Sequence, residues 1–137
     1  MPQLVKGGKW VFGWVVIGPR REIPIPLEAY LEYGFQAGDE VVFLKGSRRS
    51  AGFSVGRAEK IPVWLQKRKL GQGRIDMPGR VIAPLEVGVQ PGDRLLAARG
   101  SGLALGFLAC GPIYEVALKH LELEVFETVQ LYGRGPP

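Results

Sequence analysis

The chain has 137 residues, of which 46% are hydrophobic and 23% charged, and this composition indicates a folded globular domain rather than a disordered segment. A single cysteine, Cys110, excludes an internal disulfide framework and a multi-cysteine zinc site, and it favours a reducing, cytoplasmic location. The longest apolar run, 10–17, is too short to span a bilayer, and no secretion signal is expected before it.

The net charge of +5 is concentrated in the middle of the chain. Residues 45–80 hold 10 basic and 2 acidic side chains, giving +8, whereas residues 1–44 carry −1 and residues 81–137 carry −2. A concentrated basic segment attracts polyanions, because its cations neutralise phosphates and release counterions. The pattern therefore favours contact with nucleic acid. A solvated basic linker that keeps two halves soluble is the alternative.

The first part of the chain predicts two strands, a helix and a β-hairpin. Aromatic and β-branched residues are typical of strands, and prolines restrict a strand to an edge or an end. Pro26 suits the first turn of a helix, and Gly34 favours its end. Asp39 is expected to accept hydrogen bonds in the turn that follows. The predicted elements are strands at 10–17 and 21–25, a helix at 27–33, a strand at 40–45, a turn at 46–49 and a strand at 50–56.

The same unit occurs a second time. Gly34-Phe-Gln-Ala-Gly-Asp39 matches Gly88-Val-Gln-Pro-Gly-Asp93, which is a shift of 54. Upstream, Pro26-Leu27-Glu28 matches Pro84-Leu85-Glu86, which is a shift of 58. The second copy therefore lacks about one helical turn. Further matches at the shift of 54 are 46–47 with 100–101 and 52–53 with 106–107.

The rest of the chain is predicted from this repeat and from local patterns. We expect one compact domain over 1–137, with repeat one at about 10–60, repeat two at about 73–118 and a C-terminal strand and tail at 119–137. The predicted elements of the second half are an irregular or short helical connector at 61–70, strands at 74–76 and 80–83, a remnant turn after Pro84, strands at 94–98 and 103–109, a helix from 112 to about 120, a strand at 121–127 and a frayed tail at 133–137.

The order R-x-I-P-I-P-L-E-x-x-x-x-x-G-F-x-x-G-D-E-V, carried by Arg21 to Val42, resembles the AbrB/MazE/SpoVT family of DNA-binding domains, the swapped-hairpin barrels. Gly79 to Leu95 carries a truncated version. The resemblance implies a mainly β fold with short helices, in which the two repeats form one AbrB-like barrel as a pseudo-dimer. A double-psi β-barrel, which shares the G-x-x-x-G-D element, is the alternative fold.

The resemblance also implies which residues contact DNA. Family members use arginines near the first two strands, and guanidinium groups bind phosphates or guanine edges in a bidentate way. The matching residues are Arg20 and Arg21 in the first copy and Arg74 and Arg80 in the second. Ordinary solubility of a turn is the alternative for the first pair. Further phosphate contacts are expected from Arg48 and Arg49 at the hairpin tip, where simple solubility is favoured, and from Lys67, Arg68 and Lys69 in the connector.

No catalytic, metal or cofactor site is expected. His120 is the only histidine, and a surface or capping role at a helix end is the interpretation we favour. Cys110 is expected to be a small buried hydrophobic residue rather than a nucleophile. Asp39 and Asp93 are interpreted as equivalent turn residues rather than as a catalytic pair. The three tryptophans, Trp10, Trp14 and Trp64, are expected to pack in the core or between the copies.

The sequence thus predicts a cytoplasmic DNA-binding protein, a transcriptional regulator of AbrB-like or SpoVT-like type, which binds duplex DNA through an arginine-rich face. We expect no enzymatic activity, no membrane association, and a monomeric pseudo-dimer or a homodimer. A non-enzymatic protein-interaction module on the same barrel, either antitoxin-like or an adaptor, is the alternative, and its partner would be a protein.

Overall fold

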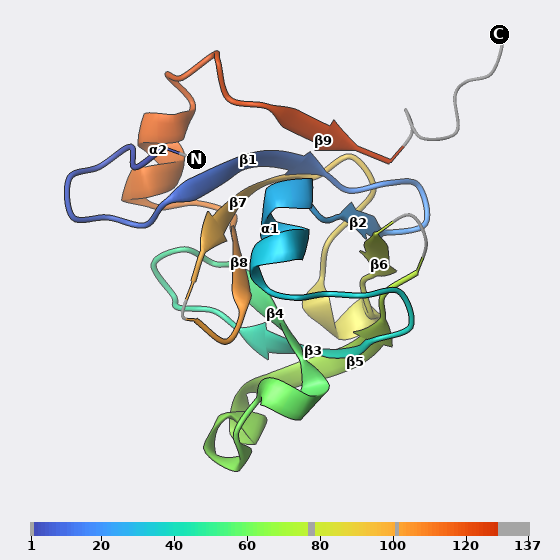
Figure 1. Ribbon diagram of the computed structural model, residues 1–137. Coiled ribbons are helices and arrows are strands. Elements are labelled where there is room, and N and C mark those ends of the chain that lie inside the picture. The colour runs from blue at the N-terminus through green and yellow to red at the C-terminus, as the bar shows by residue number, and fades with distance from the viewer. Residues whose placement is uncertain (1, 77–78, 101, 129–137) are drawn as a thin grey trace, which may run out of the picture.

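The computed structural model describes residues 2–76, 79–100 and 102–128 (Figure 1). None of the helices in these ranges is long and apolar enough to cross a membrane. The strands are β1 (Val11–Val16), β2 (Glu22–Pro24), β3 (Glu40–Lys45), β4 (Phe53–Arg57), β5 (Lys69–Arg74), β6 (Arg80–Ile82), β7 (Arg94–Arg99), β8 (Leu105–Leu108) and β9 (Val125–Glu127). The α-helices are α1 (Leu27–Glu32) and α2 (Pro112–Ala117), and the 3-10 helices are η1 (Ala58–Lys60), η2 (Val63–Arg68) and η3 (Leu85–Val87).

Seven of the strands form one sheet in the order β5-β3-β4-β8-β7-β1-β9, and β2 pairs with β6 in a separate ribbon. Neighbours in the large sheet are antiparallel except β1 and β9, which run parallel along one side of the molecule (Figure 1). The predicted fold class, mainly β with short helices, is confirmed. The barrel is not closed: within the described residues the sheet ends at β5 and at β9, and these strands do not pair with each other.

The two copies of the repeat exchange strands within this sheet. β1, from the first copy, pairs with β7 of the second copy, and β5, from the second copy, pairs with β3 of the first. β4 and β8 hold equivalent places in the two copies and pair with each other, as do β2 and β6. The first strand of each copy therefore pairs with a strand of the other copy.

The two copies make equivalent backbone hydrogen bonds at residues that are 58 positions apart, which is the shift that matches Pro26 with Pro84. The N–H of Ile25 donates to the carbonyl of Gly79 at 3.2 Å, and the N–H of Ala83 donates to the carbonyl of Arg21 at 2.9 Å. Because residue 25 matches residue 83 and residue 21 matches residue 79, this is one contact made in both directions. Reciprocal contacts of this kind are produced by two-fold symmetric halves. The two copies are thus related by an approximate two-fold axis.

The predicted turn role of Asp39 and Asp93 is confirmed. The Oδ2 atom of Asp39 accepts a hydrogen bond from the N–H of Gln36 at 2.9 Å, and Oδ2 of Asp93 accepts one from the N–H of Gln90 at 2.9 Å. A short carboxylate is suited to this bond because it reaches the backbone a few residues away. Both carboxylates are therefore structural residues of equivalent turns.

The main core lies between the large sheet and the β2–β6 ribbon. Phe43 and Phe107 are fully buried in the sheet, and Ile23 of β2 and Val81 of β6 pack in the same cluster. Full burial of each such side chain contributes about 1.5–3 kcal/mol. The ribbon is therefore held against the sheet by apolar packing as well as by the reciprocal hydrogen bonds.

Several predicted element boundaries differ from the observed ones. The helix of the second copy is short, as predicted: η3 has 3 residues where α1 has 6. The first strand of the second copy begins earlier than predicted, because β5 starts at Lys69 rather than at 74. The closing strand is shorter than predicted, because β9 begins at Val125, and Leu121 in the preceding turn is 92% exposed. The expected tail at 133–137 lies outside the described residues.

Two predictions about single side chains are wrong. Cys110 is exposed rather than buried, and its Sγ atom lies 3.3 Å from the carbonyl oxygen of Arg49. Trp14 is in the core at 4% exposure, but Trp10 and Trp64 are 41% and 68% exposed. Periodicity could not place Trp64, because the short 3-10 helix that carries it has no regular apolar face.

Candidate nucleic-acid interface

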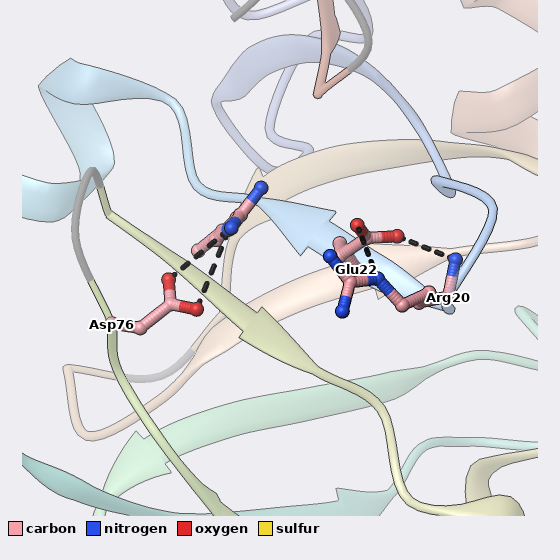
Figure 2. Close-up of polar contacts among 4 residues, drawn as sticks. Arg20, Glu22 and Asp76 are labelled. Carbon is pink, nitrogen blue, oxygen red and sulfur yellow. Dashed lines mark hydrogen bonds and ion pairs between the residues drawn. The ribbon is translucent and has the colours of Figure 1, made fainter. Parts of the chain in front are cut away.

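Two of the arginines predicted to contact DNA, Arg20 and Arg80, lie at the β2–β6 corner beside carboxylates. The Arg20 Nε atom lies 3.9 Å from Oε2 of Glu22, and the Arg80 Nε atom lies 3.2 Å from Oδ1 of Asp76. Figure 2 shows the Arg20–Glu22 contact and the contact of Asp76 as two separate pairs. Each carboxylate offsets the positive charge of its arginine, so this corner is less positive than its arginines alone indicate.

Glu22 is a buried carboxylate that organises this corner. It is 2% exposed, and its Oε1 atom accepts a hydrogen bond from the backbone N–H of Arg20 at 2.6 Å (Figure 2). The adjoining turn is closed by two backbone bonds, from Gly18 N to the Glu22 carbonyl at 2.9 Å and from Arg21 N to the Gly18 carbonyl at 2.9 Å. Glu22 therefore fixes the turn, while the Arg20 side chain, 77% exposed, extends from it.

Arg21 and Arg74 are also held by the protein itself. The Nε atom of Arg21 donates to the carbonyl of Ala83 at 3.2 Å. Arg74 donates from one terminal nitrogen to the carbonyl of Gly38 at 2.8 Å and from the other to Oε2 of Glu40 at 3.1 Å. These bonds explain the two side chains as links between strands, without requiring a ligand.

The arginines of the corner do not occupy equivalent positions in the two copies. The shift that matches Pro26 with Pro84 also pairs Arg21 with Gly79 and Glu22 with Arg80. The hydrogen bonds confirm this match, because the bond from Gly18 N to the Glu22 carbonyl, 2.9 Å, recurs from Asp76 N to the Arg80 carbonyl, 2.9 Å. Arg21 therefore has a glycine, and Arg80 a glutamate, at the equivalent place in the other copy. The signs of the charges are instead reversed between the copies.

Cations without a carboxylate partner gather at the other end of the molecule, around the loop between β3 and β4. A hollow of about 300 Å³ there is lined by three kinds of residue: the cations Lys9, Lys45 and Arg68, small residues such as Ser47, Ser50, Gly100 and Gly106, and the apolar residues Leu44, Phe53, Leu65 and Leu108. Arg68 is anchored by bonds to two carbonyls, from Nε to Lys45 at 3.2 Å and from a terminal nitrogen to Gly46 at 3.3 Å. Because backbone carbonyls are neutral, these bonds do not offset the positive charge of Arg68.

A second hollow of about 380 Å³ adjoins the first and adds Lys6 and Arg49 to the basic lining. The two hollows share Lys9, Ser47 and Ser50, so they form one continuous surface, which we call the hairpin groove. No aspartate or glutamate is among its lining residues in the described part of the chain. The groove thus combines five cations with serine hydroxyls, which is the chemistry that binds phosphate.

The loop that forms this groove is itself ordered by hydrogen bonds. The Ala51 N–H donates to the Ser47 carbonyl at 3.0 Å, and the Gly46 N–H donates to the Gly52 carbonyl at 3.0 Å. The hydroxyls of Ser47 and Ser50 lie 3.2 Å apart. The loop can therefore present its polar groups in a fixed arrangement, at a lower entropy cost on binding.

The structure thus divides the predicted site residues into two groups. Arg20, Arg21 and Arg80 at the corner and Arg74 on β5 lie outside the hairpin groove, whereas Arg49 and Arg68 line it. Arg48 is exposed in the groove's loop, Lys67 is exposed on η2 beside Arg68, and Lys69, also exposed, bonds through Nζ to Oε1 of Gln72 at 2.8 Å.

Sequence reasoning missed Lys6, Lys9 and Lys45 as site residues. Lys6 and Lys9 lie in a segment of net negative charge, and Lys45 is one of the 10 basic residues of the segment 45–80.

The ion pair of Arg99 differs from the free cations of the groove. Its guanidinium binds both carboxylate oxygens of Glu32, at 2.6 and 2.7 Å, and so ties β7 to α1. The hydrogen bond from Arg99 holds the pKa of Glu32 below its usual value. Next to it, the N–H of Gly100 donates to the hydroxyl of Tyr33 at 3.3 Å, and burial raises the pKa of that phenol. This network holds one wall of the groove in place, because Gly100 lines it.

Neither His120 nor Cys110 lies in a catalytic arrangement within the described residues. The Nδ1 atom of His120 is 2.8 Å from Oε2 of Glu122, which is an exposed pair beyond the end of α2. No protein-family model matches the chain, and neither a curated protein nor a solved structure is similar to it. The geometry of the groove and of the corner is therefore the basis for the functional argument.

Proposed function

We propose that this chain is a DNA-binding protein with an AbrB-like fold, a transcriptional regulator that holds duplex DNA against the hairpin groove. The observation that carries the proposal is the groove itself, in which five cations and no carboxylate line one continuous surface of the described chain. Neutralisation of phosphates by such cations supplies most of the affinity of non-specific DNA binding. The proposed interface lies at the β3–β4 loop rather than at the arginine corner first predicted.

The strand exchange supports the proposed relationship to swapped-hairpin barrels. Each copy of the repeat supplies a strand that pairs with the other copy, through β1 with β7 and β5 with β3. In such an arrangement two units complete one shared fold, and joining them in one chain removes the concentration-dependent cost of association. The chain differs from a closed barrel because β5 and β9, the two edge strands of the sheet, do not pair with each other in the described residues.

The experiment that tests the proposal compares two variants that lose the same charge. Lys9→Gln with Lys45→Gln removes two groove cations, and Arg20→Gln with Arg74→Gln removes two arginines outside the groove that pair with carboxylates. Binding of a short duplex of random sequence is measured by fluorescence anisotropy between about 50 and 200 mM salt. We expect the groove variant to lose more affinity and to show a salt slope shallower by roughly 0.9 for each phosphate contact removed.

Two results would count against the proposal. If both double variants weaken binding equally, net charge alone determines affinity and the groove is not the interface. If the wild-type chain shows no salt-dependent binding of duplex DNA, the function itself is wrong. The mass of the chain, determined in the same buffer, tells whether a 15.0 kDa monomer or a dimer is the binding species.

A protein-interaction module remains the second candidate function, and exposed leucines favour it. Leu27 and Leu31 lie one turn apart on α1, and both are 69% exposed. Leu85, the equivalent of Leu27 in the second copy, is 75% exposed. Exposed apolar side chains in a group are typical of protein interfaces. If this face binds a protein, a Leu27→Glu, Leu31→Glu variant loses the partner or the dimer in light scattering. An unchanged mass and unchanged partner binding would remove this support.

A further inference from the structure

Trp64 presents the most exposed aromatic ring among the tryptophans. It is 68% exposed, compared with 41% for Trp10 and 4% for Trp14. Val63 beside it is 87% exposed. An indole leaves a large apolar area in water when it is not packed, and exposed tryptophans are enriched where proteins bind other molecules. The described structure contains no ring contact for Trp64, so packing within the fold does not explain it.

The backbone that follows Trp64 is anchored at two residues. Leu65, the next residue, packs against the buried cluster of Val42, Leu44 and Ile61. Arg68, at the end of η2, is bonded to the carbonyls of the β3–β4 hairpin at 3.2 and 3.3 Å. The exposed ring is therefore displayed from a fixed element, which lowers the entropy lost when it binds.

Basic residues flank Trp64 along the chain. Lys60, Lys67, Arg68 and Lys69 lie within a few residues of Trp64, and Glu59, the acidic residue of this segment, is 3.1 Å from Arg57. Leu65 and Arg68 of the same helix line the first hollow of the hairpin groove. Trp64 is thus next in the chain to a residue that lines the hairpin groove. Aromatic rings beside cationic grooves are the arrangement by which proteins hold single-stranded nucleic acids, because every base offers a stacking face.

We infer that Trp64 stacks on an unpaired base of a nucleic acid strand whose phosphates lie in the hairpin groove. The inference rests on the proposed function and deepens it, because it names single-stranded nucleic acid as a ligand that this site binds better than an intact duplex. In a duplex the base faces are covered by their neighbours, and an exposed ring can reach them only at ends or at unstacked steps. Single strands offer every base.

A membrane surface fits the same residues less well. An interfacial helix needs a broad apolar face that enters the headgroup region. η2 has 6 residues, its Leu65 is turned into the protein, and its exposed apolar surface is limited to Val63 and Trp64. This small apolar tip matches one or two bases.

The test measures the affinity of four forms of the full chain for oligo(dT) and for a duplex of equal length. The four forms are the wild type, Trp64→Phe, Trp64→Ala and the control Leu121→Ala. Leu121 is 92% exposed and is not among the groove residues, so its loss removes comparable apolar surface elsewhere. Stacking contributes about 1–3 kcal/mol per base, so Trp64→Ala should weaken oligo(dT) binding by about 5- to 140-fold. Trp64→Phe should retain part of the affinity, and duplex binding should change little.

Tryptophan fluorescence provides the second readout. Oligo(dT) should quench the emission of the wild type, and most of the quenching should disappear in Trp64→Phe, which leaves Trp10 and Trp14 in place. Equal losses on both nucleic acids, no loss in Trp64→Ala, or tighter binding to anionic vesicles than to oligo(dT) would overturn the inference while salt-dependent duplex binding stands. If the wild type binds neither nucleic acid, the inference and the proposed function fail together.

Discussion

Phe53 and Phe107 occupy the same position in the two copies of the repeat, and each is the other's partner across β4 and β8. Their rings are stacked, with centroids 5.1 Å apart and an angle of 22° between the planes. A residue that meets its own equivalent lies beside the axis that relates two halves. The approximate two-fold axis of the fold therefore passes between these two rings, in the middle of the core.

Replacing these rings should destabilise the protein in a non-additive way. Phe53→Ala and Phe107→Ala should each lower the free energy of unfolding by about 3–5 kcal/mol, because each leaves a cavity in a packed core. The double variant should lose less than the sum, since the two side chains contact each other. Urea unfolding followed by circular dichroism measures all three. Strict additivity would show that the rings do not share a contact in solution.

Gly79 should not tolerate a side chain, although the space around it is open enough. Its φ is +106°, and a Cβ there would lie 3.4 Å from the nearest Tyr30 ring atom, an ordinary contact. The cost therefore comes from the backbone, and Gly79→Ala should lower the free energy of unfolding by about 1–2 kcal/mol. Gly102→Ala, which meets nothing within 4 Å and has no positive φ, is the matched control. Equal midpoints for the two variants would contradict the argument.

Glu22 should matter to stability far more than the arginine that accompanies it. Glu22→Ala removes the buried acceptor of the Arg20 N–H, 2.6 Å away, and should cost about 1–3 kcal/mol. Arg20→Ala keeps that N–H and removes an exposed side chain, so its effect should stay within about 0.5 kcal/mol. Thermal and urea unfolding compare the two. A loss in Arg20→Ala as large as in Glu22→Ala would assign the stabilisation to the ion pair instead.

Acid stability should depend on Arg99. The hydrogen bond from Arg99 lowers the pKa of Glu32 in the folded chain below 4.5, its ordinary value. A lowered pKa adds stability above the unfolded value and loses it as pH falls through the folded value. The wild type should therefore lose stability below about pH 4.5, and Arg99→Gln should show a flatter decline in Tm over the same range. Lys119→Gln serves as the control for lost charge. A decline of equal steepness in Arg99→Gln would contradict this linkage.

The repeat made much of the fold predictable from the sequence. β3 was predicted with its observed bounds, and the loss of a turn in the second helix followed from the smaller shift between the copies after that helix. β5 was misplaced because its glycines, at 71 and 73, give no strand signal. They are needed there for close packing, since a Cβ at Gly71 would lie 2.7 Å from Pro84. Tertiary contact, rather than local propensity, decides such a strand.

The candidate site was predictable only in part. The basic middle segment pointed to Arg49 and Arg68, both of which line the groove. Lys6 and Lys9 come from a segment of net negative charge, and the fold alone brings them beside the β3–β4 loop. At the corner, the sequence shows arginines but not the partners that offset them. Glu40 is far from Arg74 along the chain, yet the two side chains lie 3.1 Å apart.

The reversed pair of Glu22 and Arg80 shows what a fused pair of repeats permits. In an assembly of identical subunits, every substitution appears on both sides of the axis, so a buried acid on one side forces a buried acid on the other. Here one chain contains both copies, so each can change separately. In the two-stranded ribbon, Glu22 of β2 is matched by Arg80 of β6. The two copies can thus diverge in sequence, and the molecule can bind a partner that lacks two-fold symmetry.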